Sequence, residues 1–216
     1  MNQGDDEVVV LTGGDPVSPD VAGDLPRRAY VIAADSGLEQ AAILGLDVDL
    51  AVGDFDSLAP AALERAMAAG CRVERHPAAK DHTDLELGLR AAVERGCRRV
   101  LVVGGHGGRL DHFLANVLLL ASADFAELVV EARVGPAHLT VVRARTELRR
   151  SAGALVSLLA LGGVARGVRT EGLRYPLRGE ELLPGSTRGV SNELTGEVGS
   201  VAVAGGVLLA VQPGPA

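Results

Sequence analysis

The sequence contains no tryptophan, and its aromatic residues are limited to three phenylalanines and two tyrosines among 216 residues. A hydrophobic core must therefore be built from alanine, valine and leucine, and few aromatic side chains are available to contact a ligand. Cysteine is also rare, with only Cys71 and Cys97, so a disulfide framework is not predicted. Apolar residues nevertheless make up 47% of the chain, which is enough for a packed globular core.

Basic residues are fewer than acidic residues in this sequence. The chain has 21 lysines and arginines against 28 aspartates and glutamates, for a formal net charge of −7. A protein that binds a phosphate backbone needs a surplus of basic residues, so no nucleic-acid partner is expected. The sequence shows no apolar run of membrane-spanning length and no basic-then-apolar leader, which predicts a cytoplasmic protein without a membrane partner.

The N-terminal part alternates between strand and helix patterns. Helices are predicted at Pro60–Ala69 with Ser57 as the cap, after the capping-box pattern Thr83–Glu86, and from Asp111 onward. The alternation predicts an α/β domain over residues 1–136, with a Rossmann-like, open, mostly parallel sheet covered by helices. Buried strands are predicted from short apolar runs at Val8–Thr12, Ala29–Ala34, Leu50–Val52, Arg72–Glu74, Arg99–Val103 and Leu128–Ala132.

The pattern changes after about Pro136, where helical periodicity fades and short β-like runs are separated by glycines. This predicts a second, all-β sandwich domain over residues 137–216. The pair Gly205-Gly206 predicts a two-residue type I′ hairpin turn between the last two runs. The runs are Thr140–Ala144, Leu155–Leu159, Val164–Val168, Val201–Ala204 and Val207–Val211.

Polar loops follow the predicted parallel strands, at Ala34–Gly37, Gly53–Ser57, Lys80–Asp84 and Gly104–His112. Ligands of open α/β sheets bind beyond the carboxyl ends of the strands, so these loops are expected to converge with the turn at Gly13 and Gly14.

Asp54 and Asp56 are two residues apart and can face one cation, and Mg²⁺ prefers such carboxylate ligands. The alternative is an ordinary helix-capping turn, although Ser57 can provide that cap by itself.

Asp84 lies at a predicted helix start, where a carboxylate can simply interact with the helix dipole. The dense polar run around it, with Lys80 as a point charge for phosphate oxygens, favours a functional role.

The glycines of Gly104–Gly108 let backbone N–H groups approach a phosphate, Arg109 adds a planar cationic fork, and Asp111 adds an acceptor. The alternative is a flexible turn with Asp111 as the helix cap. Neither a Walker loop nor a dinucleotide fingerprint is present, and the histidines lack zinc-ligand spacing.

With these loops taken together, the chain resembles the thiamine pyrophosphokinase family. The matching segments are Ala34–Gly37, Gly53–Ser57, Asp81–Asp84, Gly104-Gly105 with Gly108–His112, and Ser191-Asn192, all in the family's order. The resemblance implies transfer of a diphosphoryl group from ATP to thiamine with release of AMP, and Mg²⁺ as cofactor. It also implies an N-terminal α/β domain, a C-terminal β-sandwich, and a homodimer with active sites formed between subunits.

Site residues are assigned by combining the loops with this resemblance. Where the family often has Gly-Leu-x-Trp, this chain has Gly172-Leu173-Arg174-Tyr175, so Tyr175 is the candidate for stacking on thiamine. Relatives with glutamine at the position of Lys80 also exist. The assigned metal ligands are Asp54, Asp56 and Asp84; the catalytic residues are Asp56, Lys80, Asp84, Arg109 and Asp111; the nucleotide-binding residues are Gly13, Gly14, Asp35, Ser36, Gly37, Gly105, Gly108, Arg109 and His112; and the thiamine-binding residues are Tyr175, Ser191 and Asn192.

Two other functions fit parts of the sequence. An Asp-x-Asp pair after an apolar strand also marks Mg-dependent phosphohydrolases, in which the first aspartate is a nucleophile. That pair would follow the first strand of the fold, whereas Asp54 follows about the third. A non-catalytic sensor of nucleotide or thiamine is the second alternative.

Overall fold

The computed structural model describes residues 6–79 and 81–214. The chain divides into two compact units. The first comprises the described residues up to Leu119 together with Glu127–Gly135, and the second comprises Leu120–Ala126 together with the described residues from Pro136 onward. Lys80 lies outside the described residues.

The first unit is built on a parallel sheet. Its strands lie in the order β4 (Arg72–Arg75), β3 (Leu50–Gly53), β2 (Tyr30–Ala34), β1 (Glu7–Thr12), β5 (Arg99–Gly104) and β6 (Val129–Val134). Each neighbouring pair within this set is parallel. The chain moves outward from β1 to β4 and then returns to place β5 on the other side of β1. The direction of winding therefore reverses between β1 and β5, which is where an open α/β sheet offers a ligand crevice.

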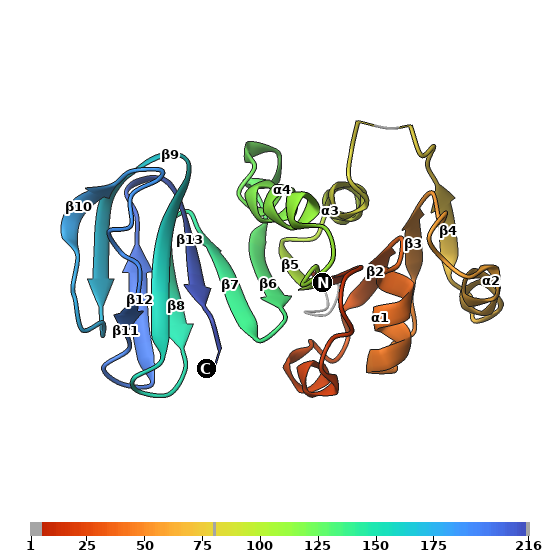
Figure 1. Cartoon of the computed structure of the whole chain (residues 1–216), viewed down its shortest axis with the longest axis horizontal. Coiled ribbons are helices and arrows are strands. Elements are labelled where there is room, and N and C mark those ends of the chain that lie inside the picture. Colours follow the sequence, from red (N-terminus) through yellow and green to blue (C-terminus); the bar gives the residue numbers. More distant parts are fainter. Residues whose placement is uncertain (1–5, 80, 215–216) are drawn as a thin grey trace. The chain divides into compact units, whose positions relative to one another are not determined.

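Helices cover both faces of this sheet. Helices α1 (Gly37–Leu44) and α2 (Pro60–Ala68) lie on one side, and α3 (Asp84–Glu94) and α4 (Leu110–Leu120) lie on the other (Figure 1). Short 3₁₀ turns occur at Pro19–Asp24 and Ala123–Phe125. Because both faces are covered, central strands can be apolar throughout, and the side chains of Val10 and Leu11 are fully buried. None of the helices in the described part of the chain has the length and apolar character of a membrane span.

The six strands predicted for this unit are present, with ends that differ by one or two residues. Thr83 caps α3 as predicted, because its Oγ1 accepts a hydrogen bond from the Glu86 backbone N–H at 3.2 Å. The prediction that Ser57 caps α2 is wrong. The helix begins at Pro60, whose fixed φ suits the first turn, and its N-cap Ala59 makes no side-chain bond. Helix α1 was not predicted.

The second unit is antiparallel. Its strands are β7 (Ala137–Val142), β8 (Arg145–Arg149), β9 (Leu155–Glu171), β10 (Arg178–Leu182), β11 (Asn192–Glu193), β12 (Val198–Ala202) and β13 (Gly205–Gln212). The long strand β9 pairs with β10, β11, β12 and β13, while β13 also pairs with β7 and β12 with β8. Its core is aliphatic, as the lack of aromatic residues requires, with Leu158, Val168 and Leu208 fully buried. The chain as a whole thus has a mixed α/β fold.

The predicted hairpin at Gly205-Gly206 is wrong. β13 pairs with β7 and with the first two thirds of β9, whereas β12 pairs with β8 and with the far end of β9. The two runs predicted as separate strands at Leu155–Leu159 and Val164–Val168 belong to this single 17-residue strand. Its length allows the segments on either side of Gly205 to pair with different stretches of β9, so they do not pair with each other.

Candidate active site

The loops that follow β1 and β5 are joined at the carboxyl end of the sheet. The Gly105 N–H donates to the Gly13 carbonyl at 2.7 Å, and the Asp15 N–H donates to the His106 carbonyl at 2.7 Å. A Cβ added at Gly14 would lie 2.4 Å from the His106 carbonyl oxygen, so only glycine allows this approach. Two loops about ninety residues apart in sequence thereby form one wall of a site at the switch point.

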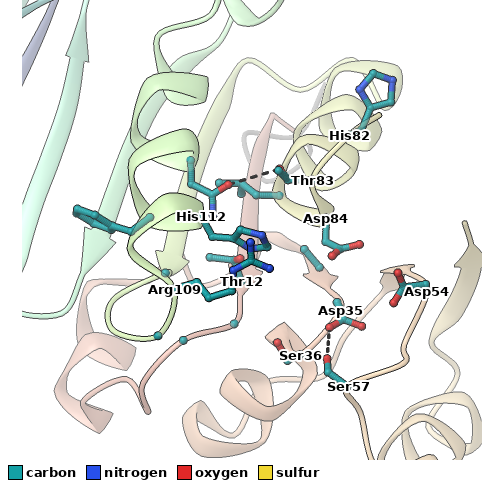
Figure 2. Close-up of a pocket in the computed structure, with 18 of the residues that line it drawn as sticks. Thr12, Asp35, Ser36, Asp54, Ser57, His82, Thr83, Asp84, Arg109 and His112 are labelled. Carbon is teal, nitrogen blue, oxygen red and sulfur yellow. Dashed lines mark hydrogen bonds between the residues drawn. The ribbon is translucent and has the colours of Figure 1, made fainter. Parts of the chain in front are cut away.

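A cavity of about 690 Å³ opens at this edge of the first unit (Figure 2). Its volume falls within the usual range for small-molecule sites. The predicted site residues that line it are Gly13, Gly14, Asp35, Ser36, Asp54, Asp56, Asp84, Gly105, Gly108, Arg109 and His112. Loops between residue 13 and residue 112 therefore converge on one cavity.

Some predicted residues do not line this cavity. Gly37 lies where α1 starts against β1, and a Cβ there would be 2.1 Å from the Leu11 carbonyl oxygen. Asp111 is also absent from the wall, although its partner Arg109 is on it. Tyr175, Ser191 and Asn192 belong to the second unit. The roles assigned to these residues stay predictions.

The Gly53–Ser57 loop presents carboxylates on either side of a buried ring. Phe55 is 7% exposed and packs with Leu58 and Leu63, and it has a φ of 61°, which is unusual for a non-glycine residue. Because Phe55 is directed into the core, Asp54 and Asp56 are left on the cavity wall. The buried aromatic side chain therefore serves to hold the acidic loop in place.

Four carboxylates crowd this side of the cavity. The pKa of Asp56 is raised above its ordinary value, first by the charge of Asp54, then by burial, and then by the charges of Asp35 and Asp84. A Cβ at Gly53 would lie 3.2 Å from Asp84 Oδ1, so the Asp84 carboxylate sits against the backbone of this same loop. The acids of three separate loops therefore lie near one another, since Gly53 also contacts Asp35.

Asp35 is the most buried of the four, at 8% exposed. Its Oδ2 accepts a hydrogen bond from the Ser57 hydroxyl at 2.5 Å, whereas its Oδ1 is buried and has no hydrogen-bond partner among the described residues. An unpaired buried carboxylate oxygen is costly unless a donor or a cation meets it.

The donor set around Asp35 suits a divalent cation with oxygen ligands. As they stand, no three His, Cys, Asp or Glu side chains in the described part of the chain are grouped closely enough to hold a metal.

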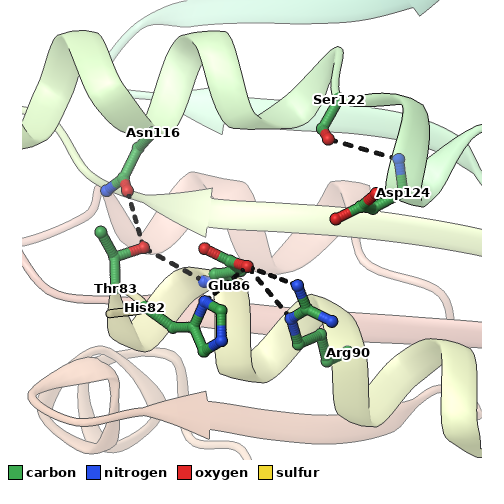
Figure 3. A network of polar contacts seen from close by, with 7 residues as sticks. All are labelled: His82, Thr83, Glu86, Arg90, Asn116, Ser122 and Asp124. Carbon is green, nitrogen blue, oxygen red and sulfur yellow. Dashed lines mark hydrogen bonds and ion pairs between the residues drawn. The ribbon is translucent and has the colours of Figure 1, made fainter. Parts of the chain in front are cut away.

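The start of α3 is fixed by contacts with α4 (Figure 3). The Thr83 hydroxyl donates to Asn116 Oδ1 at 3.4 Å while accepting from the Glu86 N–H. Glu86 Oε1 in turn lies 2.9 Å from His82 Nδ1 and 2.8 Å from Arg90 Nη2. These contacts hold the first turn that carries Asp84.

Arg109 and Asp111 form a bidentate pair. Nε of Arg109 donates to Oδ1 of Asp111 at 3.1 Å, and Nη2 donates to Oδ2 at 2.6 Å. The hydrogen bond from Arg109 is the main cause that lowers the pKa of Asp111 to about 2. Asp111 is therefore ionised throughout the neutral range and is a weak proton acceptor, and its geometry suits it to orient the guanidinium fork.

Several cavity residues were missed from the sequence. Ser57 was interpreted as a helix cap, and Thr12, Thr83 and Asn116 were assigned no ligand role. Asn116 had a detectable signal, because it follows His112 by four residues and Arg109, which directly precedes the helix, by seven. That spacing places all three on one helix face, and all three line the cavity.

A glycine-rich switch point that faces clustered carboxylates is the arrangement of a protein that binds a phosphate-bearing ligand. The comparisons with known proteins identify the family. The sequence model described as "Thiamin pyrophosphokinase, catalytic domain" matches residues 25–131, and that described as "Thiamin pyrophosphokinase, vitamin B1 binding domain" matches residues 143–208. The chain belongs to the thiamin pyrophosphokinase family, a family of kinase-type diphosphotransferases.

Individual relatives agree with this assignment. The chain is 27% identical over 210 residues to the thiamine pyrophosphokinase of Bacillus subtilis (strain 168), which covers 94% of this chain and 96% of the relative. The crystal structure of a thiamin pyrophosphokinase from Geobacillus thermodenitrificans is similar with a TM-score of 0.82, at 26% identity and over 97% and 98% of the two chains. The thiamin pyrophosphokinase from Candida albicans shares the fold, with a TM-score of 0.79 at 14% identity over 97% and 90%.

The crowding of carboxylates predicts an unusual effect on stability. Because the folded-state pKa of Asp56 is raised, its ionised form destabilises the fold. This destabilisation is absent at pH values below the unfolded-state pKa and is complete at pH values above the folded-state pKa. Asp56→Asn should therefore raise the melting temperature at pH 7–8 in the presence of a chelator, and the gain should vanish as the pH falls toward 3. Calorimetry from pH 3 to 8 measures this. Asp47→Asn, at an exposed carboxylate outside the cavity, is the charge-matched control. An Asp56→Asn variant less stable than wild type at neutral pH would contradict the crowding.

Proposed function

We propose that this protein transfers the diphosphoryl group of ATP to the hydroxyethyl group of thiamine, giving thiamine diphosphate and AMP. The observation that carries the proposal is the single cavity in which glycine-rich loops and Arg109 face a group of four carboxylates. The membership of the chain in the thiamin pyrophosphokinase family supports the same reaction.

In the proposed reaction, the hydroxyethyl oxygen of thiamine attacks the β-phosphorus of ATP. A new oxygen–phosphorus bond forms as the bond between the β-phosphorus and the α–β bridging oxygen breaks, and AMP leaves with that oxygen. Such transfers depend on positioning and charge neutralisation rather than on a covalent intermediate with the protein. The active site therefore has to hold two substrates in line and stabilise the negative charge.

The residues of the first unit supply that binding. The Gly105 N–H is already bonded to the Gly13 carbonyl, so Gly105 would only allow the close approach of a phosphate, whose oxygens would accept from the Gly108 N–H. The Arg109 fork, held by Asp111, would neutralise the phosphate charge. We propose the same role for Lys80. Because the low pKa of Asp111 makes it a weak base, we favour Asp84 as the acceptor of the hydroxyl proton.

We further propose that Asp54, Asp56 and Asp84 hold Mg²⁺, with Asp35 beside them. When bound, the ion would neutralise phosphate charge during the transfer. The support from this structure is the effect of the other three carboxylates on the pKa of Asp56, together with the unpaired Oδ1 of Asp35. Removing one of these negative charges should therefore weaken metal-dependent turnover without disrupting the fold.

We propose that the second unit is a β-sandwich whose thiamine site comprises Tyr175, Ser191 and Asn192. We also propose a homodimer whose active sites combine residues from two subunits. Helix α4 supports a protein–protein contact, because Leu110, Leu114 and Leu118 recur every four residues and are each at least half exposed.

A cytoplasmic location, which supplies ATP, is consistent with the two free, buried cysteines.

The two alternative functions are not favoured. Trapping an aspartyl-phosphate on Asp54 would support the phosphohydrolase. Binding of ATP and thiamine without turnover would support the sensor.

The central prediction is that purified protein, incubated with ATP, Mg²⁺ and thiamine, forms AMP and thiamine diphosphate in equal amounts. Asp56→Asn should lower kcat by about two orders of magnitude or more, because it removes a carboxylate from the proposed metal site. Coupled AMP detection and chromatography of thiamine diphosphate measure both products, and Asp47→Asn is again the control. Formation of inorganic phosphate and ADP in place of AMP, or near-normal turnover by Asp56→Asn, would refute the assignment.

A second prediction concerns thiamine binding. Tyr175→Ala should raise the KM for thiamine about tenfold, because it removes an exposed ring proposed to stack on the substrate, and should change the KM for ATP little. Steady-state kinetics with each substrate varied in turn give both constants. Equal increases in the two values would remove the stacking role.

A further inference from the structure

Two short segments of the second unit pair with each other beside Tyr175. Leu173 and Leu194 form an antiparallel bridge. The Arg174 N–H donates to the Glu193 carbonyl at 2.9 Å, and the Thr195 N–H donates to the Gly172 carbonyl at 2.9 Å. Regular backbone pairing of the two segments thus extends to Arg174, one residue before the candidate aromatic contact.

At Tyr175 the backbone is hydrogen-bonded by the side chain of Asn192 instead of by another backbone segment. Asn192 Oδ1 accepts from the Tyr175 N–H at 2.9 Å, and Asn192 Nδ2 donates to the Tyr175 carbonyl at 2.7 Å. Both backbone polar groups of Tyr175 are therefore bonded to one amide group, as they would be to a neighbouring strand. The backbone of Tyr175, which lies outside the strands, is therefore fixed by the side chain of Asn192 in β11.

Oδ1 of Asn192 has no capacity left for a ligand. It also accepts from the Glu193 N–H at 2.9 Å, so both lone pairs of this oxygen are used. The residue is only 3% exposed. An amino group on a bound substrate could not donate to Oδ1 without displacing a backbone bond.

The Tyr175 ring, by contrast, is available. Tyr175 is 59% exposed, and the Arg174 guanidinium lies 5.6 Å from its ring centroid while Arg174 Nη1 bonds Glu193 at 2.8 Å. A fixed backbone with an exposed ring is the arrangement expected of a preorganised stacking surface.

We infer that Asn192 is a positioning residue that acts on thiamine through Tyr175, and is not a direct thiamine ligand. This inference rests on the proposed function, because it takes Tyr175 as the aromatic contact for thiamine. It replaces the direct thiamine contact predicted for Asn192 from the sequence with a role in fixing the ring that the substrate meets.

A double-mutant cycle in the full-length enzyme tests the inference. Asn192→Ala should raise the KM for thiamine about tenfold and leave the KM for ATP unchanged. In the Tyr175→Ala background, whose backbone groups are still present, the same substitution should change the thiamine KM less than about twofold. Factors that multiply in the double variant would show direct contact and overturn the inference. The isosteric Asn192→Asp, which places a carboxylate oxygen against the Tyr175 carbonyl, should behave like Asn192→Ala.

The absence of tryptophan provides a second readout that does not depend on activity. The chain has two tyrosines, so Tyr30→Phe leaves Tyr175 as the sole fluorophore of its kind and retains a ring under Arg95. In this background, Asn192→Ala should lower the tyrosine fluorescence anisotropy of the ligand-free protein at a temperature at which its melting curve shows the variant to be folded. Unchanged anisotropy would overturn the positioning role.

The two readouts separate this inference from the proposed function. If Tyr175→Ala leaves the thiamine KM unaltered, the proposed stacking fails, and the anisotropy alone decides whether Asn192 orders the ring.

Discussion

The first unit has to hold four like charges close together at one edge of its sheet. Asp35, Asp54, Asp56 and Asp84 come from three loops and lie close enough to raise the pKa of Asp56. Ionised carboxylates that face one another destabilise a fold unless a cation or a donor compensates them. The sheet, the buried Phe55 and the contacts at the start of α3 all act against this repulsion, so the acids are held where a cation and phosphates could meet them.

Unusual backbone conformations occur in the acidic loops and next to Asn192. In the described part of the chain, the non-glycine residues with positive φ are Asp35, Phe55 and Ser191. The first two lie in the acidic loops, and the third directly precedes Asn192, the residue that bonds the Tyr175 backbone. Such conformations are retained where the surrounding structure requires them, and they concentrate at functional sites. In this chain they indicate one functional region in each unit.

Much of the first unit could be predicted from the sequence, because continuous apolar runs report burial directly and parallel strands bring their following loops to one edge. Convergence of Gly13, Asp54, Asp84 and Arg109 follows from that rule alone. The bond from Ser57 to Asp35 could not be predicted, because a serine between a strand and a helix has the same local pattern whether it caps the helix or bonds a distant carboxylate.

The second unit was less predictable, since its pairing is non-local. Glycines within β9 suggested separate strands, and Gly205-Gly206 suggested a hairpin, because local turn chemistry carries no information about which distant strand supplies the hydrogen bonds. The same limit applies to Asn192. An asparagine can either contact a substrate or hydrogen-bond the backbone of a neighbouring segment, and only the position of Tyr175 distinguishes these two roles.

The proposed function depends most on the acidic cluster holding a cation together with the nucleotide. A crystal of the full-length protein grown with Mn²⁺ and a non-hydrolysable ATP analogue tests this directly through anomalous scattering. The proposed function predicts an anomalous peak within coordination distance of carboxylate oxygens from Asp54, Asp56 and Asp84 and of the analogue's phosphates. A nucleotide bound in the cavity with its metal away from all three aspartates would contradict it.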